Sequence, residues 1–327
     1  MGKAETMKAI LVTEYGGPEH MQWGDVPRPE VGPNQVLIKV EATSVNFADI
    51  KARYGKKGAL PFIPGLDATG RIQEVGEAVE QFHPGQRVIC FPKMGSYAEY
   101  VVADENLTFA LPESIDLMTA AAFPVVSFTS YFLLAKVARL APGETVLIHA
   151  AAGGIGTTAL QMAKQLGAGK VIGTVGHPDK QERAYDSGAD YVLDYKTFAN
   201  EVNAITDGQG ADVILDSIAG EVTEQSLACL AFYGRLVHFG NSSSAIGHIK
   251  TNQLHSSCRS VLGFSFGTTR QKRPEWVQEV APNVLELIVN GKIDIKIGKH
   301  FPLQEAAEAH KWVESRQSTG KVILTLE

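Results

Sequence analysis

The sequence predicts an α/β protein with two domains, one built from antiparallel strands and the other from a doubly wound parallel sheet. Three observations lead to this prediction. The 327 residues are 44% apolar, which is enough material for more than one core at about 150 residues per domain. In the first third, short apolar runs alternate with turn residues. From about residue 126 onward, strand-like and helix-like segments alternate.

The first part of the chain reads as a series of short strands. In the run 35–42, Val36, Ile38, Val40 and Ala42 share one face, as a half-buried strand requires. The other candidates lie at residues 21–26, 71–75, 87–91 and 97–102. Gly-Pro and Pro-Gly turns occur at 17–18, 32–33, 64–65 and 84–85. This series predicts an antiparallel barrel or sandwich.

The second part reads as alternating strands and helices. Strand candidates lie at 145–150, 170–175, 190–194, 212–216, 235–240 and 260–266, and helical stretches between them include 156–166, 180–187 and 221–231. Such alternation requires parallel strands with right-handed crossovers. A helix at 275–290 is expected to close this domain.

The last part, 293–327, contains a helix (304–316) and a strand (321–326) that could return to the first domain. The expected division is therefore 1–125 and 293–327 for one domain and 126–292 for the other.

Composition excludes several classes of function. A net charge of −6 provides no basic field for dedicated nucleic-acid binding. The three cysteines lack a CxxC pair, which argues against a Cys-rich zinc site and favours a reducing compartment. No apolar leader is evident at the N-terminus, so a cytoplasmic location is expected. Residues 117–135 carry no charge, but Pro124 and several hydroxyl residues favour a buried helix over a membrane span.

The strongest motif is the run Ala-Ala-Ala-Gly-Gly-Ile-Gly at 150–156, where a strand leads through a Gly-rich turn into a helix. Small residues let the backbone approach a pyrophosphate, and the helix N-terminus stabilises its charge. We therefore expect Ala152, Gly153, Gly154 and Ile155 to bind a dinucleotide. The alternative is a plain tight turn.

The choice of nucleotide follows from the end of the second strand in this domain. An NAD site usually carries an acidic residue there, but this chain continues with Gly176 and His177, and Lys180 follows. These residues predict NADP(H), with Lys180 pairing with the 2′-phosphate. Alternatively, Lys180 is an ordinary exposed residue and Asp179 binds the ribose.

Taken together, five motifs resemble the zinc-independent quinone oxidoreductases of the medium-chain dehydrogenase/reductase superfamily. They are Ser-Val-Asn-Phe-Ala-Asp (44–49), Pro-Gly-Leu-Asp-Ala-Thr-Gly (64–70), the run at 150–156, Phe-Gly-Asn-Ser-Ser (239–243) and Gly-Lys-Val (320–322). The resemblance implies a GroES-like β-barrel catalytic domain interrupted by a Rossmann domain. It also implies transfer of hydride or electrons from NADPH to a quinone, and a homodimer formed through the edge strand 260–266.

Zinc alcohol dehydrogenases of the same superfamily are the main rival. Their zinc site needs a cysteine where this chain has Asn46, and a histidine where it has Leu66. No metal site is therefore expected, which disfavours alcohol oxidation. Two further alternatives are reduction of enones or 2-alkenals with NADPH, and a non-catalytic NADPH-binding protein.

The resemblance implies roles for two catalytic candidates. Asn46 would donate a hydrogen bond to the cofactor ribose or to the substrate carbonyl, and it could also cap the helix that follows. Tyr54 would act as a proton donor, or else be a packed aromatic residue. Asp49 and Arg53 are four residues apart on the same expected helix, so we expect an ion pair rather than acid–base chemistry.

Further cofactor contacts are implied by the same resemblance. Tyr195, at the end of the third parallel strand, would lie by the 2′-phosphate, although a strand-end tyrosine is also ordinary packing. Arg316 could instead be a solvated helix cap. The remaining implied contacts are Thr129, Phe239, Gly240, Asn241, Ser242 and Phe264.

Overall fold

The computed structural model describes residues 5–55 and 59–326 and divides into two compact units. The first unit holds the described residues up to Val125, the segment Thr268–Val289 and the described residues from Ile297 onward. The second unit holds Val126–Gly267 and Asn290–Lys296. Each unit is built around its own sheet.

The sheet of the first unit is centred on its longest strand, β3 (Gln35–Val45). The strand order is β14-β15-β3-β4-β5-β7, with β6 also paired to β3. The other members are β4 (Ala68–Val75), β5 (Arg87–Cys90), β6 (Tyr100–Asp104), β7 (Thr108–Ala110), β14 (Ile297–Pro302) and β15 (Lys321–Thr325). The pairs are antiparallel except β14 with β15, which is parallel.

Apolar side chains on one face of β3 form a core of this unit, as the alternation predicts. Val36, Ile38 and Val40 pack with Ile72 of β4 and Val101 of β6. The terminal strand β15 pairs with β3 in the register Val322 to Val45, so the expected return of the C-terminus to the first domain is found. A two-stranded ribbon, β1 (Thr6–Val12) with β2 (Met21–Pro27), completes the strands of this unit.

The helices of the first unit come from distant parts of the chain. They are α1 (Phe47–Tyr54), most of α8 (Phe266–Lys272), α9 (Pro274–Val289) and α10 (Ala306–Glu314). The expected helix 275–290 thus exists as α9, but it packs with the first unit instead of closing the second. One reason is Arg270, a buried residue whose guanidinium donates to the carbonyl oxygens of Leu66, Pro92 and Lys93 at 2.8, 2.9 and 3.3 Å.

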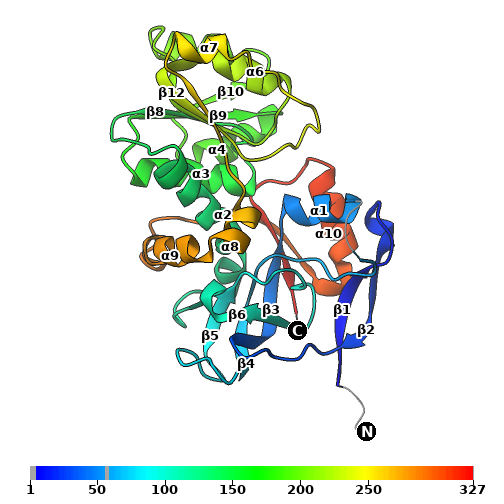
Figure 1. Cartoon of the computed structure of the whole chain (residues 1–327). Helices are drawn as coiled ribbons and strands as arrows, with labels where there is room; N and C mark the ends of the chain where they lie inside the picture. The colour runs from blue at the N-terminus through cyan, green and yellow to red at the C-terminus, as the bar shows by residue number, and fades with distance from the viewer. Residues whose placement is uncertain (1–4, 56–58, 327) are drawn as a thin grey trace. The chain divides into compact units, whose positions relative to one another are not determined.

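The second unit contains a six-stranded parallel sheet in the order β10-β9-β8-β11-β12-β13, the doubly wound arrangement that the alternation predicts. Its strands are β8 (Thr145–Ile148), β9 (Lys170–Val175), β10 (Tyr191–Asp194), β11 (Ala211–Asp216), β12 (Leu230–His238) and β13 (Ser260–Gly263). The connecting helices are α3 (Gly154–Gln165), α4 (Gln181–Tyr185), α5 (Phe198–Ile205), α6 (Glu221–Ala228) and α7 (Asn252–His255). Helices α3 and α4 lie on one face of the sheet, and α6 and α7 on the other (Figure 1).

The edge strand β13 is shorter than predicted, because it ends at Gly263 and not at residue 266. The Phe264 amide still donates to His238 O at 3.0 Å, but its ring stacks on Phe132 with centroids 5.4 Å apart. Phe266 begins helix α8 and packs against Phe128 and Phe132. Aromatic packing therefore replaces strand pairing over these last residues.

Within the described residues, one helical stretch, Leu117–Val137, is long and apolar enough to cross a membrane. It consists of α2 (Leu117–Tyr131), which contains Pro124, and a π-helical turn over Phe132–Val137. Of its most apolar window, 72% is buried inside the protein. This burial is what a core helix of a folded protein shows.

Candidate functional site

The Gly-rich turn of the second unit connects β8 to the N-terminus of α3. Gly153 is the N-cap of α3 and makes no side-chain cap bond, so the first amides of the helix are not satisfied by a capping side chain. A Cβ atom at Gly156 would lie 2.2 Å from Ala150 O, so only glycine fits where the helix crosses the turn. The turn thus has the open helix N-terminus and the close packing that a pyrophosphate site requires.

Tyr195 lies directly against this turn. Its hydroxyl accepts a hydrogen bond from the Ala150 amide at 2.7 Å, and its ring stacks on His149 with centroids 5.8 Å apart. Burial raises the pKa of Tyr195, so the phenol stays protonated at neutral pH. The structure therefore places Tyr195 beside the turn residues Ala152–Ile155, in the same unit as the predicted dinucleotide site.

The end of β9 carries the residues that were predicted to select NADP(H). Gly176 and His177 are exposed, and Lys180 is half-buried in a short 3-10 helix, Pro178–Lys180. Burial lowers the pKa of Lys180. The Asp179 side chain is 86% exposed and lies 3.2 Å from His177 Nδ1, so it points into solvent. Lys180 and Asp179 both follow the end of β9, so each stays a candidate for the ribose end of a nucleotide.

The loops that follow β11 and β12 are hydrogen-bonded to each other at the carboxyl end of the sheet. Ser242 N donates to Ser217 O at 3.0 Å, and Ser243 N donates to Ile218 O at 3.1 Å. These bonds hold the segment from Phe239 to Ser242 where open parallel sheets bind ligands. The same unit also contains Phe264, and Thr129 as a buried residue of α2.

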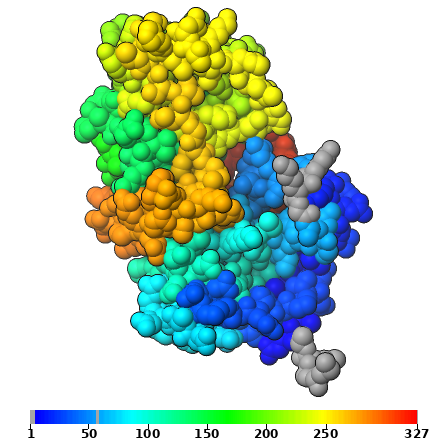
Figure 2. Space-filling view, viewed as in Figure 1, coloured from blue at the N-terminus to red at the C-terminus, as the bar shows by residue number. Residues whose placement is uncertain are grey.

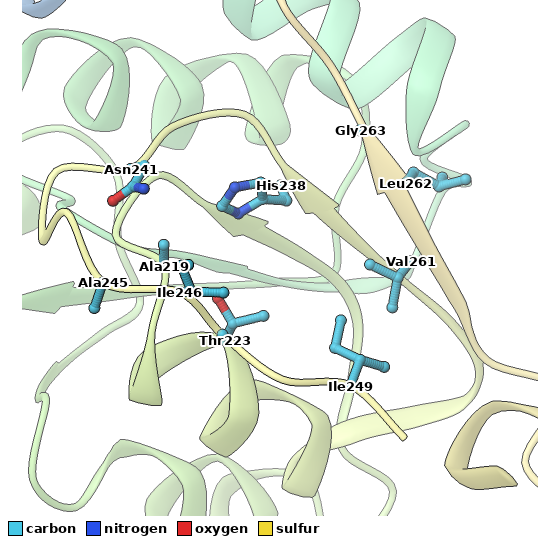
Figure 3. Close-up of a pocket in the computed structure, with 11 residues that line it drawn as sticks. Ala219, Thr223, His238, Asn241, Ala245, Ile246, Ile249, Val261, Leu262 and Gly263 are labelled. Carbon is cyan, nitrogen blue, oxygen red and sulfur yellow. The ribbon is translucent and has the colours of Figure 1, made fainter. Parts of the chain in front are cut away.

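A pocket of about 350 Å³ lies beneath the loop after β12. Its lining is largely apolar, with Ala245, Ile246 and Val261 among the contributors. Figure 3 shows His238 at the end of β12 and Asn241 in the following loop, both in this lining. Among the predicted cofactor residues, Asn241 is therefore next to a small apolar cavity on the face of the sheet that α6 covers.

The first unit buries a polar group that we call the Asn46 cluster, and all of its members are less than 8% exposed. It consists of Ser44, Asn46, Asp49, Asp67 and Lys321. The end of β3 supplies Ser44, the start of α1 supplies Asn46 and Asp49, and the first residue of β15 supplies Lys321. Asp67 directly precedes β4.

The members of the cluster hold one another through short hydrogen bonds. Lys321 Nζ donates to Asn46 Oδ1 at 2.7 Å, and Asn46 Nδ2 donates to Asp67 Oδ1 at 3.2 Å. Ser44 Oγ lies 2.9 Å from both Asp67 oxygens. Burial raises the pKa of Asp67, and the neighbouring Lys321 ammonium opposes that effect.

Asp49 fixes the backbone of Asn46. Its Oδ2 accepts from Asn46 N at 2.8 Å and from the Tyr97 hydroxyl at 3.4 Å. Burial raises the pKa of Asp49 to about 7. The Tyr97 hydroxyl also lies 3.1 Å from His310 Nε2, and burial together with the charge of Arg53 lowers the pKa of His310 to about 3. His310 is therefore a neutral hydrogen-bonding partner in the core.

The expected ion pair between Asp49 and Arg53 is wrong. The guanidinium of Arg53 is completely buried and points toward α10, where it pairs with Glu314 and donates to His310 Nδ1 at 3.4 Å. It also donates to the Gly16 carbonyl. The i,i+4 spacing on a helix predicted the pair with Asp49, but Arg53 pairs instead with Glu314, which is distant in sequence.

Two predicted site residues lie at the surface of the first unit. Tyr54 is 52% exposed at the end of α1, and its ring centroid lies 4.5 Å from the Arg53 guanidinium carbon. Arg316 is exposed just beyond α10, in left-handed backbone with φ 59°. The structure brings neither into the hydrogen bonds described for the Asn46 cluster.

Sequence reasoning missed the polar partners of Asn46. Asp67 and Lys321 belong to motifs that carry the family resemblance, but no role was predicted for either. The signal for Lys321 is a charged residue opening the otherwise apolar strand Lys321–Thr325. A lysine at such a position is buried only when partners compensate its charge.

Two family models match the chain. The model described as "Alcohol dehydrogenase GroES-like domain" covers residues 32–113, and "Zinc-binding dehydrogenase" covers residues 154–286. A quinone oxidoreductase from Pseudomonas aeruginosa is 38% identical over 97% of this chain and 99% of its own length. The chain belongs to the quinone oxidoreductase family of the medium-chain dehydrogenases/reductases. The predicted fold class, a GroES-like domain with a Rossmann domain, is thereby confirmed.

Other relatives in this superfamily carry related names. A 2-haloacrylate reductase from Burkholderia sp. is 33% identical over 97% of this chain and 98% of its own length. The solved structure of Escherichia coli quinone oxidoreductase complexed with NADPH is similar with a TM-score of 0.91, at 32% identity over 98% of this chain and 100% of that one.

One of the matching family descriptions names zinc, so the donor set is worth examining. Leu66 has no ligand atom in its side chain, and the Asn46 oxygen is already bound by an ammonium. Within residues 5–55 and 59–326, no group of three or more His, Cys, Asp and Glu side chains is placed to hold a metal ion. The side chains at these positions therefore do not fit the ligand set of a zinc alcohol dehydrogenase.

The pKa of Asp49 gives a prediction about stability. Between the ordinary value of 3.8 and about 7, the folded state holds a proton that the unfolded chain has lost. Stability should therefore fall as pH rises through this window, by at most about 1.4 kcal/mol per pH unit from this group. Asp49→Asn cannot ionise, so its Tm relative to the unsubstituted protein should rise between pH 5 and pH 8 in thermal melts.

The matched control is Asp25→Asn, because the Asp25 side chain is 61% exposed. Its Tm offset should stay constant over the same pH range. Parallel pH curves for Asp49→Asn and the unsubstituted protein would show that Asp49 is ionised across the window.

Proposed function

We propose that this chain is a metal-independent, NADPH-dependent reductase of quinones. Two observations in one chain carry the proposal. The first is the Gly-rich turn at the N-terminus of α3, and the second is the Asn46 cluster, whose polar groups hydrogen-bond to one another. The names of the relatives add the acceptor class, since one is a quinone oxidoreductase at 38% identity and another is a quinone oxidoreductase complexed with NADPH.

The second unit would bind the nucleotide. The N-terminus of α3 and the residues from Ala152 to Ile155 suit the pyrophosphate, because no capping side chain occupies the first amides of the helix. Lys180, Tyr195, Gly176 and His177 suit the 2′-phosphate end. The residues Phe239–Ser242, with Thr129 and Phe264, suit the nicotinamide end, and Asn46 and Arg316 are further candidate contacts. When bound, NADPH supplies the hydride for reduction.

The first unit would stabilise the reduced acceptor. Reduction places negative charge on an oxygen of the quinone, and a fixed hydrogen-bond donor stabilises that charge without moving during the reaction. Asn46 is our candidate for this donor, because its amide is held by Lys321 and Asp67. Tyr54 stays a candidate proton donor on the grounds of the resemblance alone.

Reduction of an activated alkene is the second candidate function. It is favoured by the relative named 2-haloacrylate reductase, because a haloacrylate is an alkene conjugated to a carboxylate. An enone or 2-alkenal would need the same donor at its carbonyl oxygen.

We also propose a homodimer formed through the edge strand β13, in a cytoplasmic protein. β13 is the last strand of its sheet, and an edge strand without a cover invites pairing with another chain. Exposed apolar side chains flank this region, including Phe232 at 68%, Tyr233 at 70% and Ile246 at 78%. Figure 2 shows residues 240–260, in yellow, at the surface. The free cysteines Cys90, Cys229 and Cys258 suit a reducing compartment.

Activity is tested by following NADPH consumption with 1,4-benzoquinone, 9,10-phenanthrenequinone and a simple enone. We expect turnover of at least one quinone by protein dialysed against a chelator, with no gain when zinc is returned. Protein-free reactions give the background. A zinc-dependent rate would refute metal independence, and NADPH binding without any turnover would point to a non-catalytic protein.

The nucleotide preference is tested with Lys180→Ala. Loss of the cation should raise KM for NADPH by about tenfold or more, since a charge-assisted hydrogen bond contributes roughly 1.5–3 kcal/mol, and should leave KM for NADH nearly unchanged. Lys292→Ala, an exposed residue of the same unit, is the matched control. Equal effects on both nucleotides would reject the assignment of Lys180.

The oligomeric state is tested by analytical ultracentrifugation. We expect a species of twice the 35.2 kDa chain mass at micromolar concentration. Replacing the half-buried Leu262 of β13 with aspartate should shift the protein toward monomer, because a charge is then buried between the paired edges. A monomeric profile for the unsubstituted protein would contradict the dimer.

A further inference from the structure

The direction in which Asn46 presents its amide decides what it can do. The oxygen of an amide accepts hydrogen bonds and the NH₂ group donates them, so only one orientation stabilises negative charge on an acceptor oxygen. We propose that Lys321 is a positioning residue that fixes Asn46 in the donating orientation. The proposal rests on the proposed function, because Lys321 acts through Asn46 and not on the acceptor.

The ammonium group of Lys321 contacts the amide oxygen of Asn46. Nζ lies 2.7 Å from Asn46 Oδ1 and 3.1 Å from Val45 O. An ammonium group carries three donors and no acceptor, so it can bind only the oxygen end of an amide. The chemistry of Lys321 therefore dictates where the Asn46 oxygen points.

A carboxylate on the opposite side completes the constraint. Asp67 Oδ1 receives Asn46 Nδ2 at 3.2 Å, and the Ser44 hydroxyl, 2.9 Å from each Asp67 oxygen, holds this carboxylate in place. Flipping the amide would place its oxygen against the carboxylate and its NH₂ group against the ammonium. Both neighbours oppose that flip.

One N–H of Asn46 is left for a ligand. The NH₂ group has two hydrogens, and Asp67 takes one of them. The remaining contacts of Nδ2, with Ser44 Oγ and Ser44 O, are long at 3.4 and 3.5 Å. A hydrogen bond this long is easily exchanged for a shorter one to a charged oxygen.

Two acidic and two basic side chains act on one another around Asn46. Asp49 and Asp67 are the carboxylates, while Lys321 and Arg270 are cations whose charges act on both of them. Lys321 is only 4% exposed, and burial lowers its pKa while the two carboxylates raise it. Lys321 could therefore serve merely to neutralise Asp67, and the experiment must separate that structural role from positioning.

The test is a double-mutant cycle with Lys321→Met and Asn46→Ala, measured as kcat and as the Kd for NADPH. If Lys321 acts through Asn46, each single substitution lowers kcat by roughly 100- to 1000-fold, the scale of a lost oxyanion donor. The double variant is then no slower than Asn46→Ala within about threefold, and it binds NADPH with the same Kd as Asn46→Ala. Lys299→Met, an exposed residue on neighbouring β14, is the control and should keep full activity.

A second readout does not depend on turnover. Selective ¹⁵N labelling of asparagine makes the side-chain amide of Asn46 observable by NMR, assigned by its loss in Asn46→Asp. In the unsubstituted protein the two amide protons should be well separated in shift and slow to exchange with solvent. In Lys321→Met they should draw together and exchange at least tenfold faster, while Lys299→Met should leave them unchanged.

Each outcome decides the proposal. Unchanged kcat in Lys321→Met, multiplicative losses in the double variant, or an amide signal insensitive to Lys321 would overturn it. If the unsubstituted protein reduces no quinone or enone, the proposed function fails, and the amide spectrum alone decides whether Lys321 positions Asn46. If Lys321→Met does not fold, by circular dichroism, the same comparisons are made with Lys321→Gln, whose neutral side chain can face either end of the amide.

Discussion

Burial of two carboxylates beside Asn46 is the constraint on which the first unit depends. Asp49 and Asp67 are almost completely inaccessible, and an uncompensated charge at that depth would cost several kcal/mol. Lys321 and Arg270 provide the compensation. Both cations follow the long segment Val126–Gly267 of the second unit in the sequence, whereas both carboxylates precede it. Because the first unit is built from separate segments of the chain, carboxylates from an early segment meet cations from later segments.

The second unit depends on a steric constraint instead. Gly156 must be glycine because Ala150 O occupies the space of a Cβ atom, and a Cβ at Gly173 of β9 would lie 2.6 Å from the Ala151 side chain. These close approaches pack the strand, the turn and α3 tightly together. In the proposed function, recognition of the nucleotide's 2′-phosphate falls to Lys180 and Tyr195. In the proposed function, the second unit binds the nucleotide and the first unit stabilises the reduced acceptor.

Local patterns predicted a large part of this structure. The alternation of strands and helices predicted the parallel sheet, and the Gly-rich run located the turn into α3, because both depend on residues close in sequence. Three predictions were wrong because they depend on contacts between residues distant in sequence. They concern the partner of Arg53, the end of β13 and the packing of α9. Lys321 and Asn46 are 275 residues apart, so no spacing rule joins them. The motifs predicted candidate site residues such as Asn46, but they did not predict the hydrogen-bond partners of these residues.

The same 275-residue separation has a consequence for biosynthesis. At translation rates of about 5–20 residues per second, Lys321 leaves the peptidyl transferase centre roughly 14–55 seconds after Asn46. By the end of that interval Val126–Gly267 and Arg270 have been synthesised, while the earlier carboxylates still lack Lys321. The domain made first on the ribosome is therefore the one that must finish last, and a nascent chain halted before its final strand would lack the ammonium group beside Asn46 and Asp67.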